Sequence, residues 1–360
     1  MNVSTMQDVA DGADERLQLV RDSASALLPR DSAPSRVRAL RFVQPGFDRG
    51  MWATMCSLGW TGLRVPETHD GTGLDVRALC AVAQQLGASL SPEPLIACAA
   101  IAPLLEGDWL AGVLDGTRLV VPAWLEGAHD LGSTPPDARR QGNRVTAHKR
   151  LVAAGSVADA FVVSTREGLA LIPRDAAGVS VKTVALRDGG FVADVDFVDA
   201  AAVPLQGALH GPLEEAALAN AAYLLGAMEA AFDLTLGYLA TRRQFGKPIG
   251  SFQALQHRAV DMKIQIELTR AVVDEAATAL DHERGGRDDR AALVSRAKMR
   301  AGGAAMLVAR ESVQFHGAMG TTDECDIGLY LRKILCVQHD FGSCIAHRGR
   351  FAAIEQARHD

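Results

Sequence analysis

The 360-residue sequence has few aromatic residues, no excess of positive charge and no long apolar run. Aromatic residues make up 5% of the chain, which argues against a platform that stacks nucleic-acid bases. Lysine and arginine number 37 against 43 aspartate and glutamate, a formal net charge of −6, so we expect no general affinity for nucleic acid or acidic membranes. The longest apolar stretches, such as residues 95–105, are too short to span a bilayer, and the polar start at Met1 has no apolar segment typical of a signal peptide. We therefore expect a cytoplasmic protein without a membrane span.

Several motifs of common catalytic sites are also missing. No cysteine pair has CxxC spacing, and the histidines are scattered without the spacing of metal ligands, so we expect reduced thiols and no metal site. No GxGxxG follows a strand-like segment, and no GxSxG is present. The sequence gives no support to a Rossmann dinucleotide site or to a serine hydrolase.

The hydrophobic pattern divides the chain into three parts. Residues 1–115 show apolar residues at helical spacing, broken by glycine and proline. Residues 116–206 contain short runs rich in β-branched residues, which predict the strands of a small barrel or sandwich. Residues 207–360 are again helical, in longer pieces. The pattern predicts an α+β protein with a helical first domain, a β middle domain and a helical last domain.

In the last domain we expect four long helices, which most economically form a bundle. The segments are 212–241, 251–281, 289–315 and 323–338. Ser251 is a plausible N-cap of the second helix, and the charged segment 283–290 is expected to be a solvated connector. In the middle domain, residues 135–143 are expected to form an exposed loop.

Three motifs carry a resemblance to a known family. The first runs from Tyr238 to Ile249 (YLATRRQFGKPI) and is followed by Phe252-Gln253 and Asp261-Met262. The second is Gln314 to Gly320 (QFHGAMG), with Arg332 further on, and the third is the segment from Leu58 to Gly73. Together they resemble the acyl-CoA dehydrogenase family, in which a helical domain, a middle β domain and a four-helix bundle follow one another. The resemblance touches all three parts of the chain.

The resemblance implies FAD, an oligomer, an acyl-CoA substrate and an electron-transferring flavoprotein as electron acceptor. An arginine such as Arg242 can hold a pyrophosphate through its fork of donors, and the amide of Gln314 can meet an adenine or ribose edge. In the family, such residues are lent by one subunit to the flavin of its neighbour. The flavin contacts that we expect on this basis are Arg242, Gln244, Phe245, Gln314, Gly317, Ala318 and Ser343. His316, inside the second motif, either faces the cofactor or is structural.

The sequence departs from the family where the flavin ring should lie. The segment 121–127 lacks the family's TEPxAGSD-like pattern, and no Ser-Asp pair follows at the usual distance. Leu151 and Ala153 stand where a Trp-x-Thr strand is expected. Since a methyl group cannot replace a threonine hydroxyl as a hydrogen-bond partner, the ring-binding half of the site is eroded.

The catalytic base is displaced as well. The family reaction removes a proton from the α carbon of a thioester while a hydride leaves the β carbon, which requires a carboxylate close to the α carbon. By counting from Arg332, the family glutamate falls on Phe341, and an alternative position falls on Ala216. Asp340 and Glu215 each lie one residue away. We expect Asp340 to be the base if this chain carries one.

Two hypotheses therefore remain open. The chain is either an acyl-CoA dehydrogenase that uses Asp340 in an oligomer, or a non-catalytic subunit that completes the FAD site of an active partner. The acyl group is not determined by the sequence; bulky steroid side chains or dicarboxylic acyl chains are suggested by analogy only.

Overall fold

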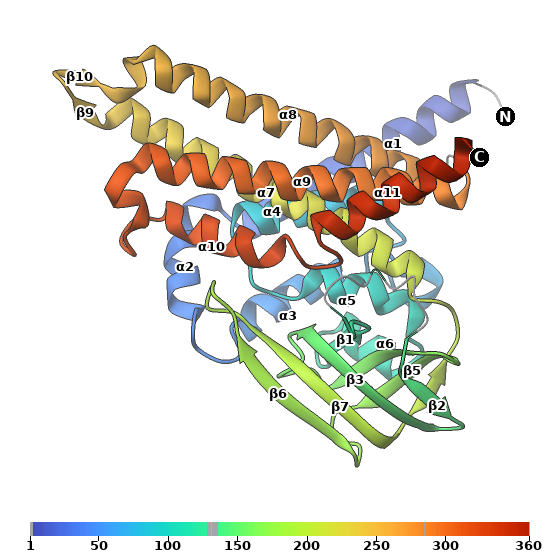
Figure 1. Ribbon diagram of the computed structural model, residues 1–360. Coiled ribbons are helices and arrows are strands. Elements are labelled where there is room, and N and C mark those ends of the chain that lie inside the picture. Colours follow the sequence, from blue (N-terminus) through green and yellow to red (C-terminus); the bar gives the residue numbers. More distant parts are fainter. Residues whose placement is uncertain (1–2, 128–130, 132–135, 284, 360) are drawn as a thin grey trace.

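The computed structural model describes residues 3–127, 131, 136–283 and 285–359. The first part of the chain is helical and the next part forms strands, as the hydrophobic pattern predicts (Figure 1). The last part consists of long helices that lie side by side above the strands (Figure 1). The expected domain limits, 115/116 and 206/207, fall between the last helix of the first part and the first strand, and between the last strand and the next helix.

The first part folds into short helices around apolar side chains that include Trp52 and Leu79. Asp75 caps one of these helices, because its side chain accepts a hydrogen bond of 2.9 Å from the Ala78 N–H. The helices are α1 (Val3–Leu27), α2 (Ala33–Leu40), α3 (Arg49–Ser57), α4 (Val76–Ala88), α5 (Leu95–Ile101) and α6 (Gly107–Leu114).

The middle part is a sandwich of two four-stranded sheets, ordered β1-β4-β5-β8 and β2-β3-β7-β6. Only the β1–β4 pair is parallel among these strands. Phe161 of β4 and Phe197 of β7 meet edge to face at 5.6 Å and join the two sheets. The strands are β1 (Val120–Ala123), β2 (Arg139–Gln141), β3 (Arg144–Ala153), β4 (Ala160–Thr165), β5 (Gly168–Pro173), β6 (Val179–Ala185), β7 (Phe191–Ala201) and β8 (Val203–Leu205).

The last part is built around α7, an alanine-rich helix that is buried on nearly all sides. A methyl group at Gly87 of α4 would lie 1.8 Å from the carbonyl oxygen of Tyr223, so glycine is required where α4 crosses α7. The elements are α7 (His210–Thr241), the hairpin β9 (Arg243–Gln244) and β10 (Lys247–Pro248), α8 (Gln253–Asp281), α9 (Arg287–His316), α10 (Ile327–Val337) and α11 (Cys344–His359).

Some local predictions were wrong. Ser251 does not cap α8, because its hydroxyl donates to the Pro248 carbonyl at 2.7 Å inside a 3₁₀ turn and the helix begins at Gln253. The segment 135–143 is not simply a loop: Ala138 is buried and β2 pairs with β3, while Pro135 lies outside the described residues.

The helix expected from Asp323 begins later, at Ile327, because the Asp323 carboxylate instead bonds Arg41 and Arg332. The final helix, α11, was not predicted at all.

No described helix is long and apolar enough to cross a membrane.

Candidate functional site

Six of the seven residues expected to contact flavin gather at one end of the last domain. Arg242, Gln244 and Phe245 belong to the end of α7 and the β9–β10 hairpin, which projects at the upper left of Figure 1. Gln314, Gly317 and Ala318 belong to the end of α9 and the turn after it. The two groups are joined by Tyr238, whose ring stacks on His316 with centroids 4.3 Å apart. The helical core thus brings together two motifs that are far apart in the sequence.

Several side chains at this end are exposed and make no polar contact within the described residues. Arg242 and Gln314 make no side-chain hydrogen bond or ion pair within the described residues, and both are exposed. Phe245 has a left-handed backbone (φ 53°) and a side chain that is 89% exposed. A phenylalanine this exposed is unusual on an isolated chain, because its apolar surface remains in water. These side chains are therefore accessible from outside the chain.

His316 does not belong to this exposed set. It is 8% exposed, and its Nδ1 donates to the Ser312 carbonyl oxygen at 2.7 Å, which fixes the proton on that nitrogen. Its ring packs on Tyr238. Of the two roles left open by the sequence, the structure supports the structural one.

Asp340 and Ser343 lie elsewhere, in the turn between α10 and α11. Lys298 of α9 lies beneath this turn, and it is separated from Gln314 by about 24 Å along the helix at 1.5 Å per residue. The Ser343 hydroxyl accepts a hydrogen bond from the Ala346 N–H at 3.2 Å, so it caps the start of α11. The chain therefore carries two separate groups of candidate residues.

The Asp340 carboxyl has an altered affinity for protons. Loss of hydration raises the pKa of the Asp340 carboxyl to about 6, although the residue as a whole is exposed. The nearby charges of Lys298 and Lys333 lower the pKa, whereas Asp188 raises it. Glu215, the other displaced carboxylate, is held by Arg64 through two hydrogen bonds of 2.7 and 2.9 Å and is not free to act as a base.

Two buried basic side chains that we did not single out from the sequence hold the turn. Lys298 is fully buried and donates to the carbonyl oxygens of Gln338 (2.8 Å) and Gly342 (3.0 Å). His347 lies between the Phe341 carbonyl oxygen (2.9 Å from Nε2) and the Ser295 hydroxyl (3.2 Å from Nδ1). Burial lowers the pKa of Lys298 to about 8 and that of His347 to about 4. A lysine on the apolar face of α9, between Val294 and Ala301, was the signal in the sequence.

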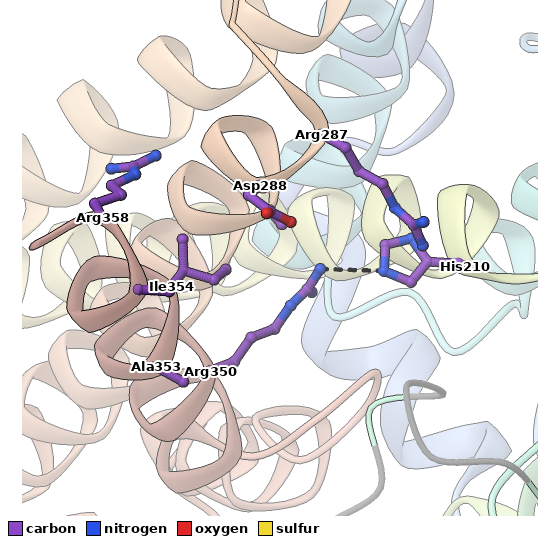
Figure 2. A pocket seen from close by; sticks show the side chains of 9 residues that line it. His210, Arg287, Asp288, Arg350, Ala353, Ile354 and Arg358 are labelled. Atoms are coloured by element: carbon purple, nitrogen blue, oxygen red, sulfur yellow. Dashed lines mark hydrogen bonds between the residues drawn. The ribbon is translucent and has the colours of Figure 1, made fainter. Parts of the chain in front are cut away.

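A pocket of about 370 Å³ lies next to this turn, between the starts of α7 and α9 and the middle of α11 (Figure 2). Two residues of the pocket wall show that it adjoins the turn. Ala291 is about one helical turn from Ser295 on α9, and Arg350 is about one helical turn from His347 on α11; Ser295 and His347 are hydrogen-bonded to each other. Arg350 pairs with Glu214 and His210, and Arg358 pairs with Asp289. Arg287 makes no hydrogen bond or ion pair within the described part of the chain, so its guanidinium is available to an anionic ligand.

The strand expected to cradle a flavin ring has no suitable side chains. Leu151 is 49% exposed with a left-handed backbone (φ 52°), at an irregularity in the pairing of β3 with β7, and Ala153 is exposed. Neither side chain can donate or accept a hydrogen bond. Next to them, Lys149 is fully buried and pairs with Glu126. Within the described residues, no group of histidine, cysteine and acidic side chains is arranged to hold a metal ion.

Comparisons with known proteins match the same regions. The family model for the N-terminal domain of acyl-CoA dehydrogenases matches residues 14–105, and the model for the C-terminal domain matches residues 207–350. The acyl-CoA dehydrogenase IpdE2 of Mycolicibacterium smegmatis is 30% identical over 331 residues, covering 89% of this chain and 92% of the relative. This chain belongs to the acyl-CoA dehydrogenase family. The family also accounts for the three-part fold.

Among solved structures, the acyl-CoA dehydrogenase fold recurs in heteromeric relatives. A variant of the steroid acyl-CoA dehydrogenase Tcur3481-Tcur3483 has a TM-score of 0.85 at 27% identity, covering 96% of this chain and 99% of that chain. The ChsE4-ChsE5 complex of Mycobacterium tuberculosis has a TM-score of 0.81 at 26% identity, covering 96% and 97%. Both names describe assemblies of two different chains.

The candidate residues fit FAD only in part. Arg242 and Gln314, exposed and without side-chain partners in the described chain, suit the phosphate and adenosine end of the cofactor. Leu151 and Ala153 do not suit the ring end. The residues of this chain therefore suit contacts to the phosphate and adenosine end of a flavin bound by a neighbouring chain better than contacts to the flavin ring.

Proposed function

We propose that this chain is the completing subunit of a heteromeric acyl-CoA dehydrogenase. In this assembly a partner chain holds the flavin ring and supplies the catalytic base, while this chain provides Arg242, Gln244, Phe245, Gln314, Gly317 and Ala318 to the other end of that flavin. The assembly dehydrogenates an acyl-CoA thioester between its α and β carbons, FAD accepts the hydride, and the electrons pass to an electron-transferring flavoprotein. A bulky acyl group, as in the steroid relatives, is the substrate class that we favour.

One observation carries the proposal. The flavin-lending residues are exposed and available, whereas the chain's own ring-binding strand presents Leu151 and Ala153. A chain that bound a complete flavin for its own use would need hydrogen-bonding groups at both ends of the cofactor. The names of the heteromeric relatives add support to an assembly in which one chain holds the flavin ring and the other contacts the far end of the cofactor.

The test is the flavin content of the chain purified alone and with a second acyl-CoA dehydrogenase-like chain. We expect a colourless protein alone and a yellow one when the two chains are purified together. One FAD per chain in a homo-oligomer of this chain would refute the proposal, because it would show that the middle domain holds the ring without the expected residues.

A second candidate function is catalysis by this chain itself, with Asp340 as the base. Two observations favour it: the pKa of Asp340 is raised to about 6, near the range in which a carboxylate can exchange protons at neutral pH, and the pocket beside its turn could receive the CoA moiety. Asp340→Asn would then abolish turnover with flavin retained, while the control Asp199→Asn, at an exposed aspartate of the middle part, would not. Unchanged activity in Asp340→Asn would eliminate this candidate.

A further inference from the structure

The turn between α10 and α11 keeps an unusual backbone. Phe341 has φ 56° and Gly342 has φ 106°, both in the left-handed region. For a bulky residue such as phenylalanine this conformation is strained, so the surrounding structure must hold it. Lys298 and His347 supply that support through three hydrogen bonds to the carbonyl oxygens of Gln338, Phe341 and Gly342.

The Phe341 side chain occupies the space between the domains. It packs against the main core cluster and also against the second cluster, which contains Trp124 and Val162 of the middle domain and Leu213 of α7. The next residue is equally confined, because a methyl group at Gly342 would lie 2.2 Å from Leu131. The half-buried ring therefore packs against apolar groups from both domains, at the position where the count from Arg332 places the family's catalytic carboxylate.

We propose that Phe341 is an apolar plug that closes the acyl-binding site of this chain, so that the assembly holds acyl chains only on the partner. The inference rests on the proposed function and deepens it, because it explains how this chain is kept from competing for substrate. A charged base in this place would need water or substrate beside it, whereas a phenyl ring is stabilised by the apolar groups that surround it. The pocket that contains Arg287 and Arg350 lies outside the plug and is left open to the CoA moiety.

The proposal predicts how the acyl chain contributes to binding. In the plugged chain, octanoyl-CoA gains nothing over free CoA, because the octanoyl group has nowhere to be buried. Truncation of this half-buried ring removes apolar volume between the two clusters, and apolar space of this kind accepts apolar ligands. Burial of even two methylene groups strengthens binding about tenfold.

The experiment is isothermal titration calorimetry of the full chain with octanoyl-CoA and with CoA. We expect the two ligands to bind the wild-type chain equally within about twofold, and octanoyl-CoA to bind Phe341→Ala at least about tenfold more tightly than CoA. Phe341→Leu is the matched control: it keeps an apolar side chain of similar bulk and should behave as the wild type. Circular dichroism and gel filtration establish that each variant is folded, and Phe341→Val replaces Phe341→Ala if the latter does not fold.

Two results would overturn the inference. One is a wild-type chain that already binds octanoyl-CoA about tenfold more tightly than CoA, and the other is a folded truncation variant with no gain for octanoyl-CoA. Neither result bears on flavin content, so failure of the plug would leave the lending role of Arg242 and Gln314 standing. Conversely, one FAD per isolated chain would refute the lending role whatever the acyl affinities are.

Discussion

At the scale of single residues, the chain is marked by buried ionisable groups around one turn. Lys298 and His347 are both almost completely buried, and each bonds backbone carbonyl oxygens rather than a carboxylate. His347 is neutral in the folded chain at neutral pH, because burial and, to a lesser extent, the Lys298 charge lower its pKa to about 4. With Nε2 donating to the Phe341 carbonyl, its Nδ1 is left to accept from Ser295.

This assignment makes a prediction about acid stability. The unfolded chain protonates His347 near its ordinary pKa of 6.5, whereas the folded chain resists protonation down to about 4. The unfolded state therefore binds more protons in this window, and the free energy of unfolding falls as the pH drops from 6.5 to 4, by up to about 3 kcal/mol from this residue. His347→Gln keeps a donor and an acceptor but does not titrate. Urea unfolding at pH 7 and pH 4.5 should show a smaller loss for the variant than for the wild type; an equal loss would contradict the assignment.

At the scale of elements, the turn between α10 and α11 depends on α9. The Lys298 side chain extends from α9 and donates hydrogen bonds to two carbonyl oxygens of the turn. Within the described residues, no backbone N–H of a helix or strand donates to these two oxygens. Each buried carbonyl left without a donor costs about 1–3 kcal/mol. The position of Asp340, Phe341 and Ser343 is thus set by a residue far away in the sequence.

Replacement of Lys298 tests this dependence. We expect Lys298→Met to lower the free energy of unfolding by about 2–5 kcal/mol, since two carbonyl groups lose their donor while the side-chain volume is kept. Lys263→Met is the control: Lys263 pairs with Glu267 on the exposed face of α8, at 2.6 Å with both side chains about half exposed, and should change stability by less than about 1 kcal/mol. A similar small effect in both variants, measured by chemical denaturation, would show that Lys298 does not support the turn.

The β9–β10 hairpin is the second element with a predicted role in the assembly. Phe245 is 89% exposed and its ring meets that of Phe252 edge to face at 6.1 Å, so it contributes little to the stability of the isolated chain. We expect Phe245→Ala to leave the melting temperature of the isolated chain within about 2 °C of the wild type but to reduce the flavin retained by the two-chain assembly. A lower melting temperature with unchanged flavin would show a structural role instead.

The sequence predicted the elements better than their ends. The three-part order, five of the strands in the middle part and the long helices of the last domain followed from the hydrophobic period, which depends on which face of each element is buried. The sequence did not predict β2, β6 or β8. Ser251 was wrongly taken as a cap because the 3₁₀ turn before α8 engages its hydroxyl, and α11 was missed because it bears polar residues on most of its surface.

The sequence predicted the exposed residues at the hairpin and at the end of α9 better than the buried residues around the turn between α10 and α11. The residues at the hairpin and at the end of α9 belong to local motifs, so the family pattern located them and the helices brought them together. Their contact with flavin stays a prediction. Lys298 and His347 belong to no motif, and their role depends on tertiary contacts with a turn that only the folded chain reveals.

At the scale of the whole molecule, the two groups of candidate residues lie apart on one chain. The flavin-lending residues are at one end of the helical domain, and the turn with Asp340 and Phe341 lies about 24 Å along α9 from Gln314. One flavin could contact both groups of residues only if they came from different chains of an assembly. The exposed end is therefore where we expect a partner chain to dock.

The most direct test is the FAD content of the two-chain assembly when only this chain is altered. A charge-assisted hydrogen bond is worth about 1.5–3 kcal/mol, so Arg242→Ala should weaken flavin binding roughly 10- to 100-fold although the ring is held by the partner. Arg348→Ala, at an exposed arginine of α11 far from the hairpin, is the control and should retain flavin as the wild type does. Loss of FAD from the assembly with Arg242→Ala alone is the result that we predict. Full FAD in that assembly, with both chains present and folded, would contradict the claim that this chain completes its partner's flavin site.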